Sequence, residues 1–220
     1  MQIVKIDKNL AKSIPQLKLS CIECSVEVST KNNKLWDKVQ AKIDELDQTI
    51  KVEEISQIPT ISSSRKAYKI CGKDPARYRL SAEALLRRVV KRGELYQVNN
   101  VEDCLNLVSI STGFSIGGYD AAKIKGEAVL GIGEKNEPYV GIGRGELNIE
   151  FMPVFRDDEG AFGTPTSDSV RTSITDETRR FLMIIIDYGA SDLLDEATEQ
   201  AVGLLREYAA ATDFQIQKIE

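Results

Sequence analysis

The chain of 220 residues contains no histidine. Histidine is the usual general base that activates a serine or cysteine nucleophile, and it is a common metal ligand. Its absence excludes Ser-His and Cys-His nucleophile pairs and any metal site that needs an imidazole. A hydrolytic reaction on this chain would have to depend on carboxylates, on a metal held by other ligands, or on groups of the substrate itself.

Long apolar segments are missing as well. The longest apolar run, FLMIII at 181–186, has the length of a strand, whereas a membrane-spanning helix needs about 18 or more apolar residues. The opening stretch MQIVKIDKNLAKSIPQ lacks the charged start, apolar stretch and cleavage site of a signal peptide. We therefore expect a cytoplasmic protein with no membrane partner.

Cysteine is sparse, with four residues, of which Cys21 and Cys24 form the C-x-x-C spacing of redox and zinc sites. The surrounding sequence LKLSCIECSVEV alternates apolar and polar residues, which indicates a half-buried strand. Residues three apart on a strand point to opposite faces. No second C-x-x-C completes a zinc site. The cysteines are therefore predicted to be structural, with no metal and no cofactor.

Helical spacing of apolar residues dominates the first half of the chain, and short β-rich runs dominate the second. Helices are predicted at 32–50, 65–72, 81–93, 101–112 and 191–211, with Ser81 and Ser191 as N-caps and 59–64 as a connection. Strands are predicted at 18–28, at 213–220 and in four runs between 127 and 187. This order favours an α+β fold, and the absence of a linker-like segment indicates one domain over 1–220.

Two glycine-rich segments invite a phosphate-binding interpretation. GFSIGGYD at 113–120 follows a predicted helix rather than a strand, and GIGRGE at 141–146 has no helix after it. Phosphate loops need a strand before the glycines and a helix N-terminus after them. Gly113 is therefore interpreted as a helix terminator, and Gly117–Gly118 as a turn.

Positive charge is concentrated in one segment of an acidic protein. The net charge is −5, but residues 65–92 contain ten basic and two acidic residues, which leaves +8 there and −13 elsewhere. Such a dipolar chain can steer a polyanion onto one face. A set of solvated helix faces would produce the same pattern, and charge alone does not separate the two.

Three groups of residues in the segment 65–126 recur in a known family. They are Asn99, Asp103, Asn106, Leu107 and Val108; the stretch GFSIGGYD with Ile124 after it; and the upstream residues Tyr78, Arg79, Ser81, Glu83, Ala84, Leu85, Arg87 and Arg88. The segment resembles the B3/B4 domain of the phenylalanyl-tRNA synthetase β subunit, and more closely the free-standing proteins that consist of this domain alone. The resemblance is specific over about 60 residues and looser as far as residue 190.

The resemblance implies a single B3/B4-like domain in which mixed or antiparallel sheets form a sandwich-like core flanked by helices. It implies a tRNA- or aminoacyl-tRNA-binding module; the alternatives are a trans-editing hydrolase of mischarged tRNA and a small-ligand or protein-binding module that kept the fold. DNA is not an expected partner, and a homo-oligomer is possible. Aminoacylation is not expected, because nothing resembles a synthetase catalytic core.

The resemblance also names candidate site residues. The pocket would contain Gly117, Gly118, Tyr119, Asp120, Thr178 and Asp187. The tRNA would contact Arg77, Arg79, Arg87, Arg88, Lys91 and Arg92. Tyr68, Tyr78 and Tyr96 either stack on unpaired bases or pack in the core. Asn99, Asp103, Asn106 and Asp120 either serve the pocket or cap helices and turns.

The chain departs from the family pattern at the positions expected to carry chemistry. Gly117 stands at the family histidine, Ser115 at the preceding proline, and Ile184 at the editing-pocket glutamate when Thr178 is aligned with the family threonine. The residues expected to read a tyrosine hydroxyl or to position a hydrolytic water are thus absent. No catalytic residue is assigned from the sequence.

Overall fold

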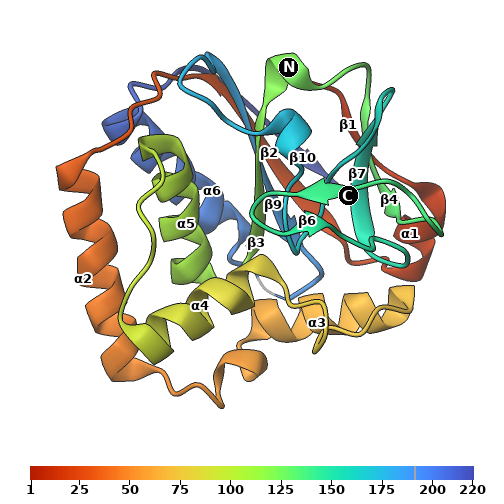
Figure 1. Cartoon of the computed structure of the whole chain (residues 1–220), viewed down its shortest axis with the longest axis horizontal. Coiled ribbons are helices and arrows are strands. Elements are labelled where there is room, and N and C mark those ends of the chain that lie inside the picture. The colour runs from red at the N-terminus through yellow and green to blue at the C-terminus, as the bar shows by residue number, and fades with distance from the viewer. Residues whose placement is uncertain (191) are drawn as a thin grey trace.

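The computed structural model describes residues 1–190 and 192–220. The helices are α1 (Lys8–Ser13), α2 (Asn33–Thr49), α3 (Pro59–Cys71), α4 (Ser81–Arg92), α5 (Asn100–Thr112) and α6 (Leu194–Tyr208). The strands are β1 (Val4–Ile6), β2 (Lys18–Ser25), β3 (Ser115–Asp120), β4 (Ala128–Ile132), β5 (Val140–Gly141), β6 (Gly145–Glu146), β7 (Pro153–Asp157), β8 (Gly160–Gly163), β9 (Arg180–Asp187) and β10 (Thr212–Ile219). Figure 1 shows the helices gathered mainly on one side and the short strands on the other.

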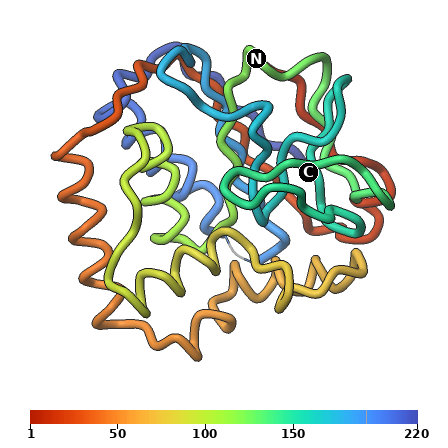
Figure 2. Tube along the Cα trace, viewed as in Figure 1, coloured from red at the N-terminus to blue at the C-terminus, as the bar shows by residue number. Residues whose placement is uncertain are grey.

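Two four-stranded sheets form the centre of the fold. One is antiparallel, in the order β10-β2-β9-β3, and the other has the order β1-β4-β7-β8 with β1 parallel to β4. Figure 2 traces how the chain, after β1 and β2, builds the helical side with residues 33–112 and then enters the remaining strands. The α+β prediction is confirmed, including the mixed sheets, the sandwich-like arrangement and the flanking helices.

Strand β9 is buried on both faces and divides the core. Its residues Phe181, Met183 and Ile185 pack among helices α2, α4, α5 and α6. The alternate residues Leu182, Ile184 and Ile186 pack against the second sheet. Because both faces are covered, the strand reads as a continuous apolar run rather than an alternating one.

The cysteines confirm the strand interpretation of CIEC. Cys24 packs on the helical side of β2 and Cys21 on the side of the second sheet. All four cysteines are buried and unpaired, and burial raises the pKa of the Cys21 and Cys24 thiols to about 12. Among the described residues no cluster of three or more His, Cys, Asp or Glu could hold a metal.

Three predicted helix starts need correction or lie outside the described residues. Residues 59–64 are the first turns of α3 and not a connection, because Pro59 occupies the N1 position that proline favours. Ser81 is not the N-cap of α4: Leu80 holds that position, and the Ser81 N–H donates to the Pro165 carbonyl at 2.7 Å. The predicted cap Ser191 lies outside the described residues. None of the described helices is long and apolar enough to cross a membrane.

The glycines of GFSIGGYD have two different causes. Gly113 ends α5 in the left-handed region with φ of 75°, as predicted. The predicted turn at Gly117–Gly118 is wrong, because both residues lie inside β3 and pair with Ile184 and Met183 of β9. A Cβ at Gly118 would lie 2.6 Å from Leu105 Cδ1, and one at Gly117 would overlap the Tyr119 hydroxyl. Close packing against this strand, and not turn geometry, requires glycine.

We expect Gly117→Ala to lower the free energy of unfolding by about 1–3 kcal/mol, because the new methyl group displaces a fully buried tyrosine. Denaturant unfolding of the variant measures the loss. Gly203→Ala on α6 is the control: nothing lies within 4 Å of its Cβ position, and a helical Gly→Ala change stabilises by about 0.5–1 kcal/mol. Equal stability of Gly117→Ala and the wild type would contradict the packing argument.

Candidate functional site

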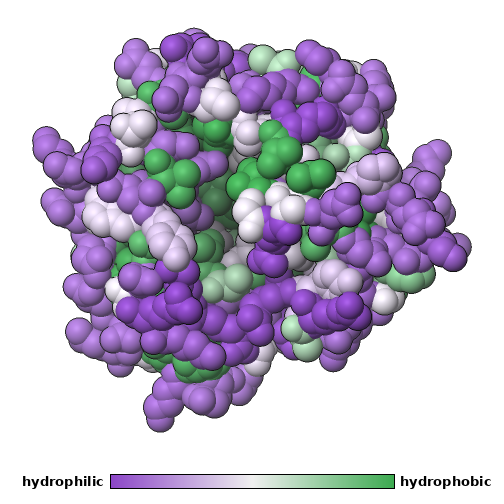
Figure 3. All heavy atoms as spheres, viewed as in Figure 1, coloured by the Kyte–Doolittle hydropathy of each residue, from purple (hydrophilic) through white to green (hydrophobic). Residues whose placement is uncertain are grey.

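A small cavity opens where α4, α5 and β3 meet the loops before β6 and β9. Its volume is about 210 Å³, and its wall consists of Ser81, Leu85, Glu102, Leu105, Asn106, Ser109, Ile116, Gly118, Ile142 and Asp168. Figure 3 shows apolar side chains in the central hollow of this face, inside a mostly hydrophilic rim. The cavity combines an apolar lining with two carboxyl groups and three neutral polar side chains.

Asp168 is held in place by strand β3. The Gly118 N–H donates to its Oδ2 at 3.2 Å, and the Tyr119 hydroxyl donates to its Oδ1 at 2.9 Å. Tyr119 reaches this position because its ring end fills the space where a side chain on Gly117 or Gly163 would stand. Its ring also packs edge-on against Phe162, with the centroids 5.0 Å apart. Because Gly117 and Gly163 have no side chains, Tyr119 fits between them and holds the Asp168 carboxylate at the cavity.

Glu102 supplies the second carboxyl group, from the first turn of α5. Its carboxylate forms no hydrogen bond or ion pair within the part of the chain that the structure describes. Burial, and then the charge of Asp103, raise the pKa of Glu102 to about 7. Burial likewise raises the pKa of Asp168 to about 7, against the opposing hydrogen bonds from Gly118 and Tyr119. Both groups therefore exchange protons near neutral pH.

The residues predicted for the pocket do not share one cavity. Gly118 lines the small cavity. Tyr119 lies behind Asp168, and a side chain on Gly117 would point toward Tyr119 rather than into the cavity. Asp120 accepts a hydrogen bond of 2.8 Å from the Thr178 hydroxyl at the far end of β3. Asp187 accepts hydrogen bonds from the Gly189 and Ala190 N–H groups and lines a separate pocket.

Sequence reasoning missed the two carboxyl groups of the cavity. Glu102 reads as an ordinary acidic residue in the first turn of a helix, a favourable place for it. Asp168 lies in the polar stretch TPTSDS, which reads as a loop. Only the tertiary fold brings these residues to Gly118, and no local spacing signals their encounter.

Four of the ten basic residues at 65–92 form ion pairs within the protein. Glu83, which is 1% exposed, lies 2.7 Å from Arg65, 2.9 Å from Arg87 and 3.7 Å from Arg79. Arg88 pairs with Glu94 at 2.8 Å. Of the ten basic residues at 65–92, those that form no ion pair within the described chain and are exposed are Lys66, Lys69, Arg77, Lys91 and Arg92.

The remaining polar and aromatic candidates are divided between core and surface. Tyr68 is fully buried and bonds to Thr166, whereas Tyr96 is 68% exposed with the Arg88 guanidinium 3.7 Å above its ring. The Lys73 ammonium lies 3.8 Å above the Tyr78 ring and donates to two backbone carbonyls. The Asn99 side chain caps α5 by accepting a hydrogen bond from the Glu102 N–H, and Asp103 accepts one from the Val98 N–H.

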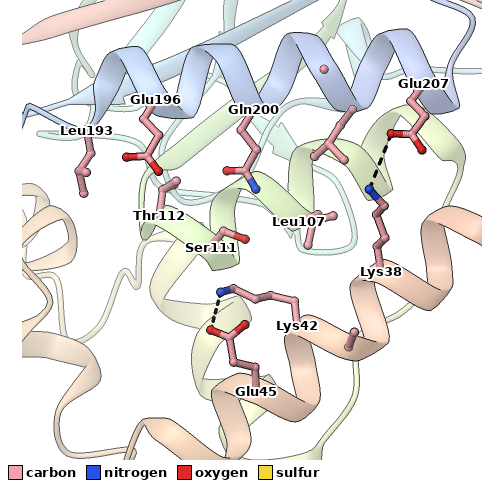
Figure 4. Close-up of a pocket in the computed structure, with 13 residues that line it drawn as sticks. Lys38, Lys42, Glu45, Leu107, Ser111, Thr112, Leu193, Glu196, Gln200 and Glu207 are labelled. Carbon is pink, nitrogen blue, oxygen red and sulfur yellow. Dashed lines mark hydrogen bonds and ion pairs between the residues drawn. The ribbon is translucent and has the colours of Figure 1, made fainter.

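A larger groove of about 840 Å³ runs between α2, α5 and α6. Figure 4 shows its side chains, with Lys42 bonded to Glu45 and Lys38 near Glu207 across the opening. These pairs are 2.7 Å and 3.7 Å long. The groove is open, and its labelled charges largely compensate each other. It offers less specific chemistry than the smaller cavity.

The family model for the B3/4 domain matches residues 63–210. The chain belongs to the B3/4 domain family. The match extends from α3 to the end of α6 and contains every residue of the cavity wall. The B3/4 fold of this chain also includes β2 and β10, which lie outside the match but share the sheet of β9 and β3.

Among solved structures, the chain is similar to an N-terminal fragment of the phenylalanyl-tRNA synthetase β subunit from Pyrococcus horikoshii. The identity is 14% and the TM-score 0.49, over 99% of this chain and 50% of the fragment. The chain thus spans about half the length of that structure. No curated protein matches the chain.

The pairing around Glu83 leads to a stability prediction. Glu83→Gln removes the charge that three arginines share and should lower the free energy of unfolding by about 3 kcal/mol. This value is the lower end of the range for breaking a buried ion pair, because the three arginines are partly exposed to solvent. Urea unfolding measures the loss. Arg79→Met is the matched control: this arginine is the most exposed and most distant partner, and we expect less than about 1 kcal/mol. Similar losses in both variants would contradict the central role of Glu83.

The pKa of Asp168 makes stability depend on pH. A carboxyl whose pKa is higher in the folded than in the unfolded chain binds more protons when folded, so it lowers stability as pH rises from about 4 to 7. Relative to the wild type, Asp168→Asn should therefore gain stability between pH 5 and pH 8 in urea titrations.

Other titratable groups near Asp168 also affect how stability depends on pH. Glu102 titrates in the same range, so a double variant with Glu102→Gln should show a larger change. Tyr119 and Tyr139, whose pKa values burial raises, keep their protons throughout. A stability difference that stays constant from pH 5 to pH 8 would contradict the prediction.

Proposed function

We propose that this B3/4 protein binds tRNA or aminoacyl-tRNA through the exposed cations of α3, α4 and the loop between them. The observation that carries the proposal is the group of five basic residues that remain without an acidic partner after the internal ion pairs of the segment are formed. Phosphates bind such cations, and the acidic remainder of the chain repels them. The resemblance of residues 65–126 to the synthetase domain supports the same assignment.

The cavity itself is an unsuitable site for a phosphate. Glu102 and Asp168 make its wall negative when ionised, and no basic side chain lines it. An RNA ligand would therefore place its backbone on Arg77, Lys91 and Arg92 and present a non-phosphate group to the cavity. The cations and the cavity would thus serve different parts of the ligand.

A trans-editing hydrolase is the second candidate function, favoured by the two carboxyl groups with a pKa of about 7. A carboxylate with such a pKa is suited to accept a proton from water near neutral pH. Release of amino acids from a panel of misacylated tRNAs, measured against a sample without protein, separates hydrolysis from binding.

The tRNA proposal predicts that Lys91→Glu/Arg92→Glu weakens binding of uncharged tRNA by 10-fold or more at 50 mM salt. The slope of log K against log salt should fall by about 2, one unit for each lost phosphate contact. Filter binding or fluorescence anisotropy at several salt concentrations measures both quantities. Arg87 is unsuitable for this test, because it neutralises Glu83.

The matched control is Lys8→Glu/Lys12→Glu on α1, an equal charge change at exposed residues outside the basic segment. This variant should retain most of the affinity and the salt slope. Equal affinity of both double variants, or wild-type binding that does not respond to salt, would contradict the proposal.

A further inference from the structure

The two carboxyl groups of the cavity differ from several other shielded acids of this chain. Glu83 pairs with three arginines, Asp157 with Arg171 at 2.7 Å and Glu23 with Arg180 at 2.7 Å. The buried Asp103 and Asp187 form no ion pair in the described chain either, but they accept hydrogen bonds from backbone N–H groups of their own loops and face no cavity of this kind. Within the described chain neither Glu102 nor Asp168 forms an ion pair. Removing a carboxylate from water without a cationic partner is costly. The cavity therefore holds two carboxyl groups and, among the described residues of its wall, no positive group that compensates them.

The geometry of the wall defines what that positive group can be. Asp168 is held by the Gly118 N–H and the Tyr119 hydroxyl, so its orientation is fixed before a ligand arrives. Apolar side chains, namely Leu85, Leu105, Ile116 and Ile142, cover much of the remaining wall. The volume of about 210 Å³ is below the ~300 Å³ typical of the smallest drug-sized sites. The space fits a short aliphatic body with one cationic end.

We propose that the cavity binds a small ligand through its ammonium group, which lies between Asp168 and Glu102, while its apolar body contacts Leu85, Leu105 and Ile116. An ammonium group has three donors and no acceptor, so it suits two carboxylates. A free carboxylate on the ligand is disfavoured by the same negative wall. Esters and amides of amino acids are thus better ligands than free amino acids.

The assignment deepens the proposed function and rests on it for the source of the ligand. The aminoacyl group of an aminoacyl-tRNA has an ammonium group and no free carboxylate, and a free amine offers the same chemistry. The first arm of the experiment leaves RNA out. It compares 3-methylbutylamine with 3-methyl-1-butanol, which has the same body without the charge, by calorimetry and by the NMR shift of the Gly118 amide at pH 8.

We expect the amine to bind at least 10-fold more tightly than the alcohol to the wild type. Asp168→Asn and Glu102→Gln should each remove most of this preference. Glu196→Gln, which removes a carboxylate from the α2–α5–α6 groove, should leave the preference unchanged. Equal binding of amine and alcohol, or a preference that survives in both cavity variants, overturns the proposal.

The second arm identifies the source and compares leucyl-tRNA with N-acetyl-leucyl-tRNA. Tighter binding of the leucyl form, lost in Asp168→Asn while uncharged tRNA still binds, supports an aminoacyl ligand. Amine preference in the first arm without any tRNA binding supports the cavity assignment with a free amine and overturns the tRNA proposal. The two proposals therefore fail in different measurements.

Discussion

The hydroxyl of Tyr119 is the contact on which the candidate site depends. It occupies the space above Gly117 and Gly163 and holds Asp168 at the cavity. A side chain at either glycine would displace the tyrosine and release the carboxylate. Because the ring also packs edge-on against both Phe155 and Phe162, the second sheet fixes the hydroxyl from behind. Gly117, which the resemblance aligns with a family histidine, is therefore part of a polar arrangement in which a carboxylate from a distant loop approaches the strand.

This arrangement also limits which side chains position 117 accepts. A histidine at position 117 meets the Tyr119 hydroxyl, and removing that hydroxyl frees Asp168. Gly117, Tyr119, Gly163 and Asp168 consequently form one unit, and exchange of any single member disturbs the others. Residues in such contact are not expected to contribute additively to stability.

The sequence was sufficient for the layers of the fold and insufficient for the site. Periodicity identified the helix at 101–112 and the opposite faces of Cys21 and Cys24, because both are local properties of a helix and a strand. It failed for Gly117 and Gly118, since glycine in a turn and glycine under a packed side chain look alike in one dimension. It also missed that Glu102 and Asp168, 66 positions apart, line the same cavity, because only the tertiary fold brings α5 and the loop after β8 to β3. The basic segment is visible in the sequence, but the ion pairs of its arginines with Glu83 depend on where α3 lies against α4.

Unpaired positive and negative side chains lie in two separate places on this protein. Within the described residues, the exposed cations of 65–92 that form no ion pair lie on α3, α4 and the loop between them, and Glu102 and Asp168, which form no ion pair either, line a small cavity beside the same α4. A ligand that is negative along its length and positive at one end matches both features, whereas a simple polyanion or a simple amine matches only one. Aminoacyl-tRNA has this distribution of charge: phosphates in its backbone and an ammonium group at its end. Each simpler ligand would leave a mismatch: a polyanion leaves the two cavity carboxylates uncompensated, and an amine leaves five exposed cations of the described chain without a partner.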